Sequence, residues 1–242
     1  LSMLPDTNAV GTYSHAPRFR AWKPDDARNL DPEHLDSFRE AAARLVSDAA
    51  DSPSRWADLS TRFDDLPPEA FDVAVAELER LVTSDATASI RQQVWEPLRS
   101  LVYNHRQYSQ TEWSMPADRA DRLEVLLGLL APDDVVQRVQ WLFDDYMPSL
   151  PEMGGLEFDA TRFQTAVGER RRQAAIDVIA ASGFEGVLRL VASSRQPELV
   201  GAAVADANDD LAGGRLLELI DSGDLLFVRS ARAWVGRKAE MA

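Results

Sequence analysis

The chain has 242 residues, of which 45% are hydrophobic and 27% charged, a balance typical of a globular protein with a substantial core. Its formal net charge of −14 disfavours nucleic acids and anionic membrane surfaces as partners. The absence of cysteine excludes disulfides, thiol catalysis and thiolate metal sites, and it fits the cytoplasmic location that we expect. No apolar run approaches the 18 residues of a membrane span, and no secretory signal pattern opens the sequence.

Residues 1–30 show no sustained periodicity and contain several prolines. We expect an ordered loop there, held in place by the packing of Tyr13, Phe19 and Trp22. The opening letters LSMLP resemble the end of a helix whose body is missing, so we expect the chain to be a piece of a larger protein.

Helical patterns fill residues 31–150, with apolar residues at spacings of three and four. Prolines, several of them after a capping residue, mark the expected helix starts, at Asp31-Pro32, Ser52-Pro53, Pro67-Pro68, Pro116 and Pro132. Pro97 lies inside the helix predicted over 86–107 and is expected to kink or split it.

Residues 151–158 contain Gly154 and Gly155 and form the clearest break in the chain. The last segment, 159–242, begins with a long helix over about 159–182, capped by Asp159 and ended by Gly183. Four shorter helices follow, over about 184–194, 196–207, 209–221 and 223–239, and Gly213-Gly214 is expected to permit close helix packing.

These patterns predict an all-α fold, since no hairpin signal or strand alternation stands out. Short connections favour successive antiparallel helix pairs, arranged irregularly. We favour an α-solenoid of degenerate HEAT- or TPR-like repeats, because the last four helices have the length that HEAT helices have. The alternative is a closed helical bundle.

The stretch WLFDDYMPSLPE places Asp144 and Asp145 side by side after three large apolar residues. Neighbours in a helix project about 100° apart, so this pair is badly placed to share a proton or a metal ion. We expect solvated aspartates at a helix end, which Pro148 and Pro151 terminate.

No sequence pattern for catalysis or for cofactor binding is present. His15, His34 and His105 lie far apart in sequence, none belongs to an HExxH or Glu-x-x-His motif, and His105 has no acidic residue near it in sequence. Phosphate-binding glycine loops and the GxSxG elbow are also missing. We therefore predict no catalytic, cofactor-binding or metal-binding residue and a protein that is not an enzyme.

Two basic stretches have alternative interpretations. Residues 15–23 interleave arginines with aromatics and could stack on bases, but we expect a loop pinned by its aromatic side chains. Arg170, Arg171 and Arg172 are expected to form the solvated face of the long helix. Nucleic-acid binding is therefore disfavoured.

The phrases YSHAPRFRAW, WEPLRSLVYNHRQYSQTEWSMPADRADRLEVLLGLLAPDD and VQWLFDDYMPSLPE resemble stretches in the long helical regions of large multidomain bacterial proteins. The resemblance covers roughly residues 1–155. It implies a sensing, scaffolding or partner-binding segment beside an effector or NTPase domain, and it supplies no catalytic residue.

We expect a non-enzymatic helical-repeat scaffold that binds a protein partner or packs against sister domains of its own chain. The acidic charge predicts a partner surface of opposite sign. The candidate contact residues are aromatic: Tyr13, Phe19, Trp22, Tyr103, Tyr108 and Trp113. The alternative is a regulatory or sensor segment of a multidomain NTPase or defence-type effector.

Overall fold

The computed structural model describes residues 32–49, 52–82, 87–155, 159–208 and 210–242, and in these ranges every regular element is a helix. The predicted loop over 1–30 lies outside the described residues. The α-helices are α2 (Pro32–Ala49), α3 (Pro53–Ser60), α4 (Pro68–Val82), α5 (Thr87–Gln107), α6 (Ala117–Leu130), α7 (Val135–Val139), α8 (Ala160–Ser193), α9 (Pro197–Asp206), α10 (Asp210–Leu217) and α11 (Leu225–Met241). Three short 3-10 helices join them: η1 (Phe63–Asp65), η2 (Gln140–Phe143) and η3 (Pro151–Met153).

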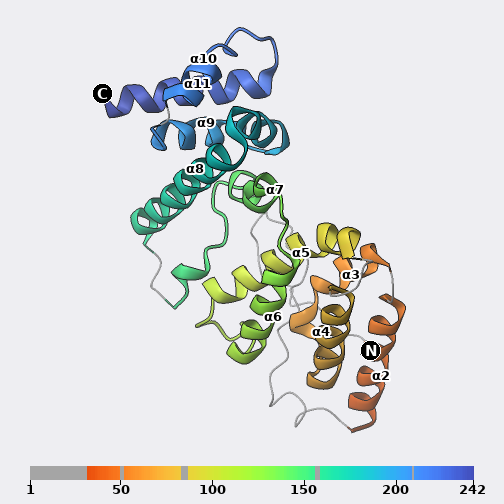
Figure 1. The fold of residues 1–242 in the computed structure, drawn as a ribbon. Coiled ribbons are helices and arrows are strands. Elements are labelled where there is room, and N and C mark those ends of the chain that lie inside the picture. Colours follow the sequence, from red (N-terminus) through yellow and green to blue (C-terminus); the bar gives the residue numbers. More distant parts are fainter. Residues whose placement is uncertain (1–31, 50–51, 83–86, 156–158, 209) are drawn as a thin grey trace.

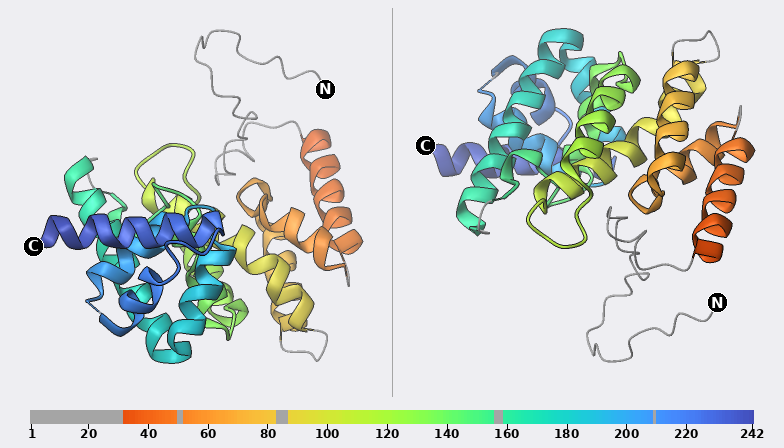
Figure 2. Two further views of the ribbon diagram at one scale, coloured as in Figure 1. Left: turned by 90° about the horizontal axis from the view of Figure 1, so that it is seen from above. Right: turned by 90° about the horizontal axis from the view of Figure 1, so that it is seen from below.

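The molecule is elongated and has two lobes (Figure 1). The first lobe holds α2 to α6 and the second holds α8 to α11, while α7, η2 and η3 belong to the segment 131–155 that joins them. We call this segment the junction. Both views in Figure 2 place α2 at one end of the molecule and the C-terminal end of α11 at the other. No helix in the described ranges is long and apolar enough to cross a membrane.

Helix starts follow the local signals in the sequence. α3 begins at Pro53, with Ser52 at the N-cap position, and α4 begins at Pro68. The side chain of Asp159 caps α8 by accepting a hydrogen bond from the backbone N–H of Arg162 at 3.0 Å. Ser52 makes no side-chain capping hydrogen bond, so proline in the first turn is the signal for α3 and α4, while a cap within three residues of its partner is the signal for α8.

Two predicted helices differ in detail from the structure. Pro97 does not split α5, which is assigned as one helix from Thr87 to Gln107. The single helix expected to run from about residue 133 into Phe143 is instead α7 followed by η2. The split is thus excluded at Pro97 while the expected kink stays a prediction, and both differences concern helix continuity, which depends on surrounding packing as well as local sequence.

The predicted end at Gly183 is confirmed. Gly183 has φ 60° and ψ −154°, so α8 bends there and consists of two helical parts. Only a residue without a Cβ adopts this backbone conformation readily. α9 packs against α8.

The first lobe is built around large apolar side chains from several helices. Phe63 of η1 packs edge-to-face on Phe71 of α4, with ring centroids 6.2 Å apart. The same core contains fully buried residues from α3, α4, α5 and α6: Trp56, Leu78, Leu98, Leu123, Leu126 and Leu130. The core is continuous with that of the second lobe through the junction residues Leu142, Phe143 and Leu150.

The second lobe depends on close approach between helices. α9 packs against both α8 and α11. A Cβ at Gly201 of α9 would overlap the backbone carbonyl of Ser230 in α11, and a Cβ at Gly213 of α10 would lie 2.5 Å from the ring of Trp234. Glycine at these two positions therefore permits the helix spacing, as expected for Gly213; Gly214, by contrast, has open space beside it.

Candidate interaction surfaces

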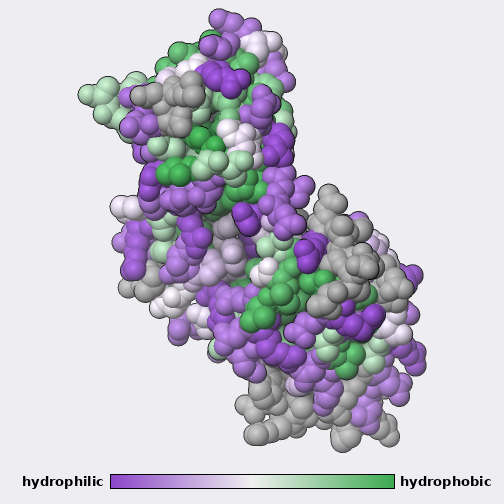
Figure 3. Space-filling view, in the orientation of Figure 1, coloured by the Kyte–Doolittle hydropathy of each residue, from purple (hydrophilic) through white to green (hydrophobic). Residues whose placement is uncertain are grey.

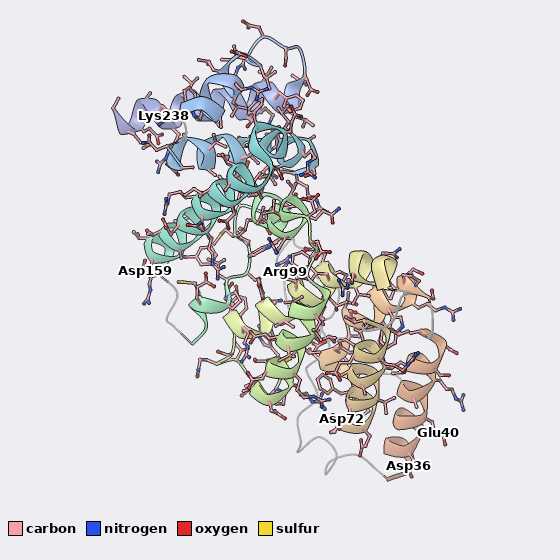
Figure 4. All side chains as sticks on the ribbon, in the orientation of Figure 1. Asp36, Glu40, Asp72, Arg99, Asp159 and Lys238 are labelled. Atoms are coloured by element: carbon pink, nitrogen blue, oxygen red, sulfur yellow. The ribbon has the colours of Figure 1, made fainter. Side chains whose placement is uncertain are left out.

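Arg99 of α5 is a buried cation that lies between the two lobes (Figure 4). Its guanidinium carbon is 4.2 Å from the ring centroid of Trp141, 5.4 Å from that of Tyr103 and 5.9 Å from that of Trp95. Its Nε donates a hydrogen bond to the carboxylate of Glu96 at 2.9 Å. The charge is therefore stabilised by one carboxylate and several aromatic faces.

Arg171 of α8 contacts the junction from the other side. Its Nε donates to the carbonyl oxygen of Leu142 at 2.8 Å, and its Nη2 donates to those of Asp145 at 2.7 Å and Tyr146 at 3.3 Å. Burial lowers the pKa of this guanidinium to about 10, so it is still protonated at neutral pH. Arg171 thus holds the irregular backbone of the junction against α8.

Arg171 corrects the prediction that all three arginines at 170–172 are solvated. Its neighbours do form exposed ion pairs, Arg170 with Glu152 and Arg172 with Glu169, each at 2.6 Å. Arg171 itself is only 9% exposed. A signal was present in the sequence, because residue 171 lies on the same helical stripe as the buried Phe163 and Val167.

The predicted aromatic contact residues divide into separate places. Tyr108 and Trp113 lie together, with ring centroids 5.5 Å apart, and Tyr108 is 44% exposed. Tyr103 instead packs edge-to-face on Trp141 in the junction, with centroids 5.3 Å apart. Tyr13, Phe19 and Trp22 lie outside the described residues.

His105 has an acidic partner that is distant in sequence. Its Nδ1 accepts a hydrogen bond from the backbone N–H of Met115 at 3.0 Å, so Nε2 bears the proton that faces Asp64 Oδ2 at 3.1 Å. His105 has no acidic residue near it in sequence, and its acidic partner is brought to α5 by the fold, through η1. This buried ring joins two elements of the first lobe.

Asp65, next to this pair, is an ionisable group in an unfavourable environment. Its Oδ1 is buried and has no hydrogen-bond partner among the described residues. Burial, and secondly the neighbouring carboxylate of Asp64, raise the pKa of Asp65 from its ordinary 3.8 to about 6. The nearby positive charge of Arg62 opposes this shift.

Replacing Asp65 by asparagine is expected to stabilise the protein above pH 6. The folded state disfavours ionised Asp65, so its stability falls as pH rises from about 4 through about 6. With allowance for solvent screening of this half-buried group, the gain at pH 7 is about 1 kcal/mol. Urea unfolding at pH 4 and pH 7 measures it, with the exposed Asp58→Asn as control. An equal gain at both pH values would contradict the assignment.

Asp144 and Asp145 form separate local hydrogen bonds. Asp144 Oδ1 accepts from the backbone N–H of Arg195 at 2.8 Å, which ties the junction to the start of α9. Asp145 is exposed and accepts from the backbone N–H of Met147 at 3.0 Å. Asp145 fits the predicted solvated role, whereas Asp144 is partly buried and structural.

An open groove of about 720 Å³ lies beside α8 in the second lobe. Its charged side chains are paired: Arg172 Nη2 is 2.6 Å from Glu169, and Arg237 Nε is 2.7 Å from Asp206. The rest of the wall is polar or small, namely Ala160, Thr161, Gln164, Thr165 and Gly168. Because the two signs of charge alternate, the groove favours no one class of charged ligand.

Hydrophobic residues appear on the surfaces of both lobes in the space-filling view (Figure 3). The most exposed large apolar side chain in the described ranges is that of Leu225, at 75%. Leu226 follows it at 36%, and Leu217, at the end of α10, is 39% exposed. We call these three residues the leucine face. The sequence predicts helices here but does not show which apolar side chains stay uncovered.

Within the described residues, no group of three or more histidine, aspartate or glutamate side chains is placed to hold a metal ion. No protein-family model, curated protein or solved structure matches the chain. The resemblance to helical regions of multidomain bacterial proteins therefore stays a prediction.

Proposed function

We propose that the chain is a non-enzymatic protein-interaction module, a helical scaffold that binds a partner through exposed apolar side chains. The observation that supports it best is the leucine face, where three leucines within ten residues are left uncovered. Each exposed leucine costs solvation free energy, and several of them within one helix–turn–helix segment favour a surface that another protein covers.

The elongated architecture supports a degenerate helical repeat more than a closed bundle. α2 and the C-terminal end of α11 lie at opposite ends of the molecule (Figures 1 and 2), whereas a closed bundle would gather its helices around one axis. An extended stack offers a broad surface for recognition. The exposed Tyr108, packed on Trp113, is a second contact candidate on the first lobe.

Site-specific photo-crosslinking tests the proposal in the native full-length protein. A photoreactive amino acid is introduced at position 225, at position 108, and at position 185 as an exposed control on α8. We expect a single crosslinked partner protein from position 225, in amounts comparable to the bait, and none from position 185. Light-dependent products are resolved by gel and identified by mass spectrometry.

The same experiment separates the two functional hypotheses. Crosslinks from position 225 that fall only on the protein's own chain would favour the regulatory alternative, in which the helices contact sister domains. If neither position 225 nor position 108 gives a specific crosslink in a well-expressed protein, the proposal of an interaction module is contradicted.

A further inference from the structure

The leucine face surrounds the turn between α10 and α11. Leu217 ends α10 and Leu225 begins α11, and between them Gly223 adopts φ 77°, which turns the chain back. Leu219 and Ile220 in the same turn are only half-buried. Exposed or half-buried apolar residues therefore occur on both sides of this turn and within it.

Three carboxylates rim this surface. Glu218, Asp221 and Asp224 are all exposed and lie within the same turn. The nearest arginines in sequence have other contacts: Arg229 pairs with Glu198 at 2.7 Å, and the guanidinium of Arg215 lies 4.3 Å from the ring centroid of Phe184. These three carboxylates, which we call the acidic rim, thus place negative charge in the turn between the exposed leucines, and Asp224 also caps α11 by accepting a hydrogen bond from the backbone N–H of Leu226.

We propose that the leucine face binds a basic amphipathic helix of another protein, an inference that rests on the proposed interaction function. Lysines or arginines of such a helix would meet the acidic rim while its apolar stripe covers the leucines. A second copy of this chain fits poorly, because it would bring the same carboxylates and a net charge of −14.

The form of the surface explains why the partner would be a helix. The described residues at this end are helical or tightly turned, so they offer side chains and no open strand edge. A partner must then satisfy its own backbone hydrogen bonds, which a helix does internally. Apolar residues at helical spacing would then cover Leu225, the most exposed of the three leucines.

Titration with a defined peptide tests the proposal. The probe is a fluorescently labelled helix of about 18 leucine and lysine residues with the leucines on one face. The control is a peptide of the same composition with its leucines and lysines in scrambled order, which has the same charge but no apolar face. We expect the amphipathic peptide to bind the full chain with one-to-one stoichiometry in fluorescence anisotropy, and at least about tenfold more tightly than the scrambled peptide.

Variants of the chain then locate the binding. We expect Leu225→Ser to weaken binding about tenfold and Asp221→Lys to weaken it several-fold, with the charge effect shrinking at high salt. Val125→Ser, at a 65% exposed apolar position on α6, and Asp133→Lys, at an exposed acidic position, are the matched controls and should leave binding unchanged. Circular dichroism checks that each variant stays folded.

Binding that is equal for both peptides, or that is unaffected by Leu225→Ser, would overturn the proposal. The results distinguish a wrong choice of ligand from a wrong proposal that the chain is an interaction module. A partner that crosslinks from position 225 while the amphipathic peptide does not bind would leave the module standing and refute the basic helix as its ligand.

Discussion

Replacing Arg171 by methionine is expected to lower the free energy of unfolding by about 3 kcal/mol. Methionine keeps most of the apolar packing but removes hydrogen bonds to the carbonyl oxygens of Leu142, Asp145 and Tyr146. Leu142 lies near the end of η2, and Asp145 and Tyr146 lie in the irregular backbone that follows it, so the guanidinium takes the place of helical N–H donors that this segment lacks. Chemical denaturation measures the loss, which corresponds to a fall in Tm of roughly 6–12 °C.

The adjacent Arg172 provides the matched control for this experiment. Its ion pair with Glu169 is on the surface, so Arg172→Met should change stability by no more than about 0.5 kcal/mol. Arg171→Lys should recover only part of the loss, because a single ammonium group cannot reproduce the planar fork of donors. Equal losses of stability for Arg171→Met and Arg172→Met would show that the buried hydrogen bonds of Arg171 contribute no more than a surface ion pair.

Replacing Gly201 by alanine is expected to destabilise the second lobe by at least about 3 kcal/mol. The added Cβ would overlap the backbone carbonyl of Ser230, and backbone cannot move aside as the end of a long side chain can. α9 and α11 would have to separate, which would loosen the packing of both helices. Urea unfolding measures the change in the free energy of unfolding. An unaltered slope of this free energy against urea concentration would show that only the native state is affected.

Alanine substitutions at two other glycines provide a comparison for Gly201→Ala. Gly213→Ala should cost less, since its neighbour is the side chain of Trp234 and the ring can shift. Gly168 in α8 has nothing within 4 Å of a new Cβ, so Gly168→Ala should stabilise the protein by about 0.5–1 kcal/mol through helix propensity. Destabilisation of similar size at all three positions would contradict the steric explanation.

Arg99 and Arg171 together explain how the lobes are joined. Arg99 of the first lobe lies over the ring of Trp141, and Arg171 of the second lobe hydrogen-bonds the carbonyl of Leu142. These two junction residues are consecutive, so the short helix η2 receives a buried cation from each lobe. A partner that binds the leucine face therefore meets a surface whose position relative to the first lobe is held through η2.

The sequence by itself determined the helical class and most helix starts and stops. Pro53, Pro68, Asp159 and Gly183 mark boundaries in the structure as they do in the sequence. Such signals are reliable because each acts within about four residues, through a cap, a missing N–H or a glycine conformation. The contact between Tyr108 and Trp113 could also be predicted from the sequence, because they lie only five positions apart.

The tertiary structure alone decided which polar and apolar groups are covered. Asp64 lies 41 residues from His105, Leu142 lies 29 residues from Arg171, and Arg99 of α5 contacts Trp141 in the junction. Helical periodicity shows that residue 171 faces inward but cannot name the carbonyls that it meets, and it cannot show that Leu225 stays exposed. Those outcomes depend on how whole helices pack, which is settled by contacts between segments far apart in the chain.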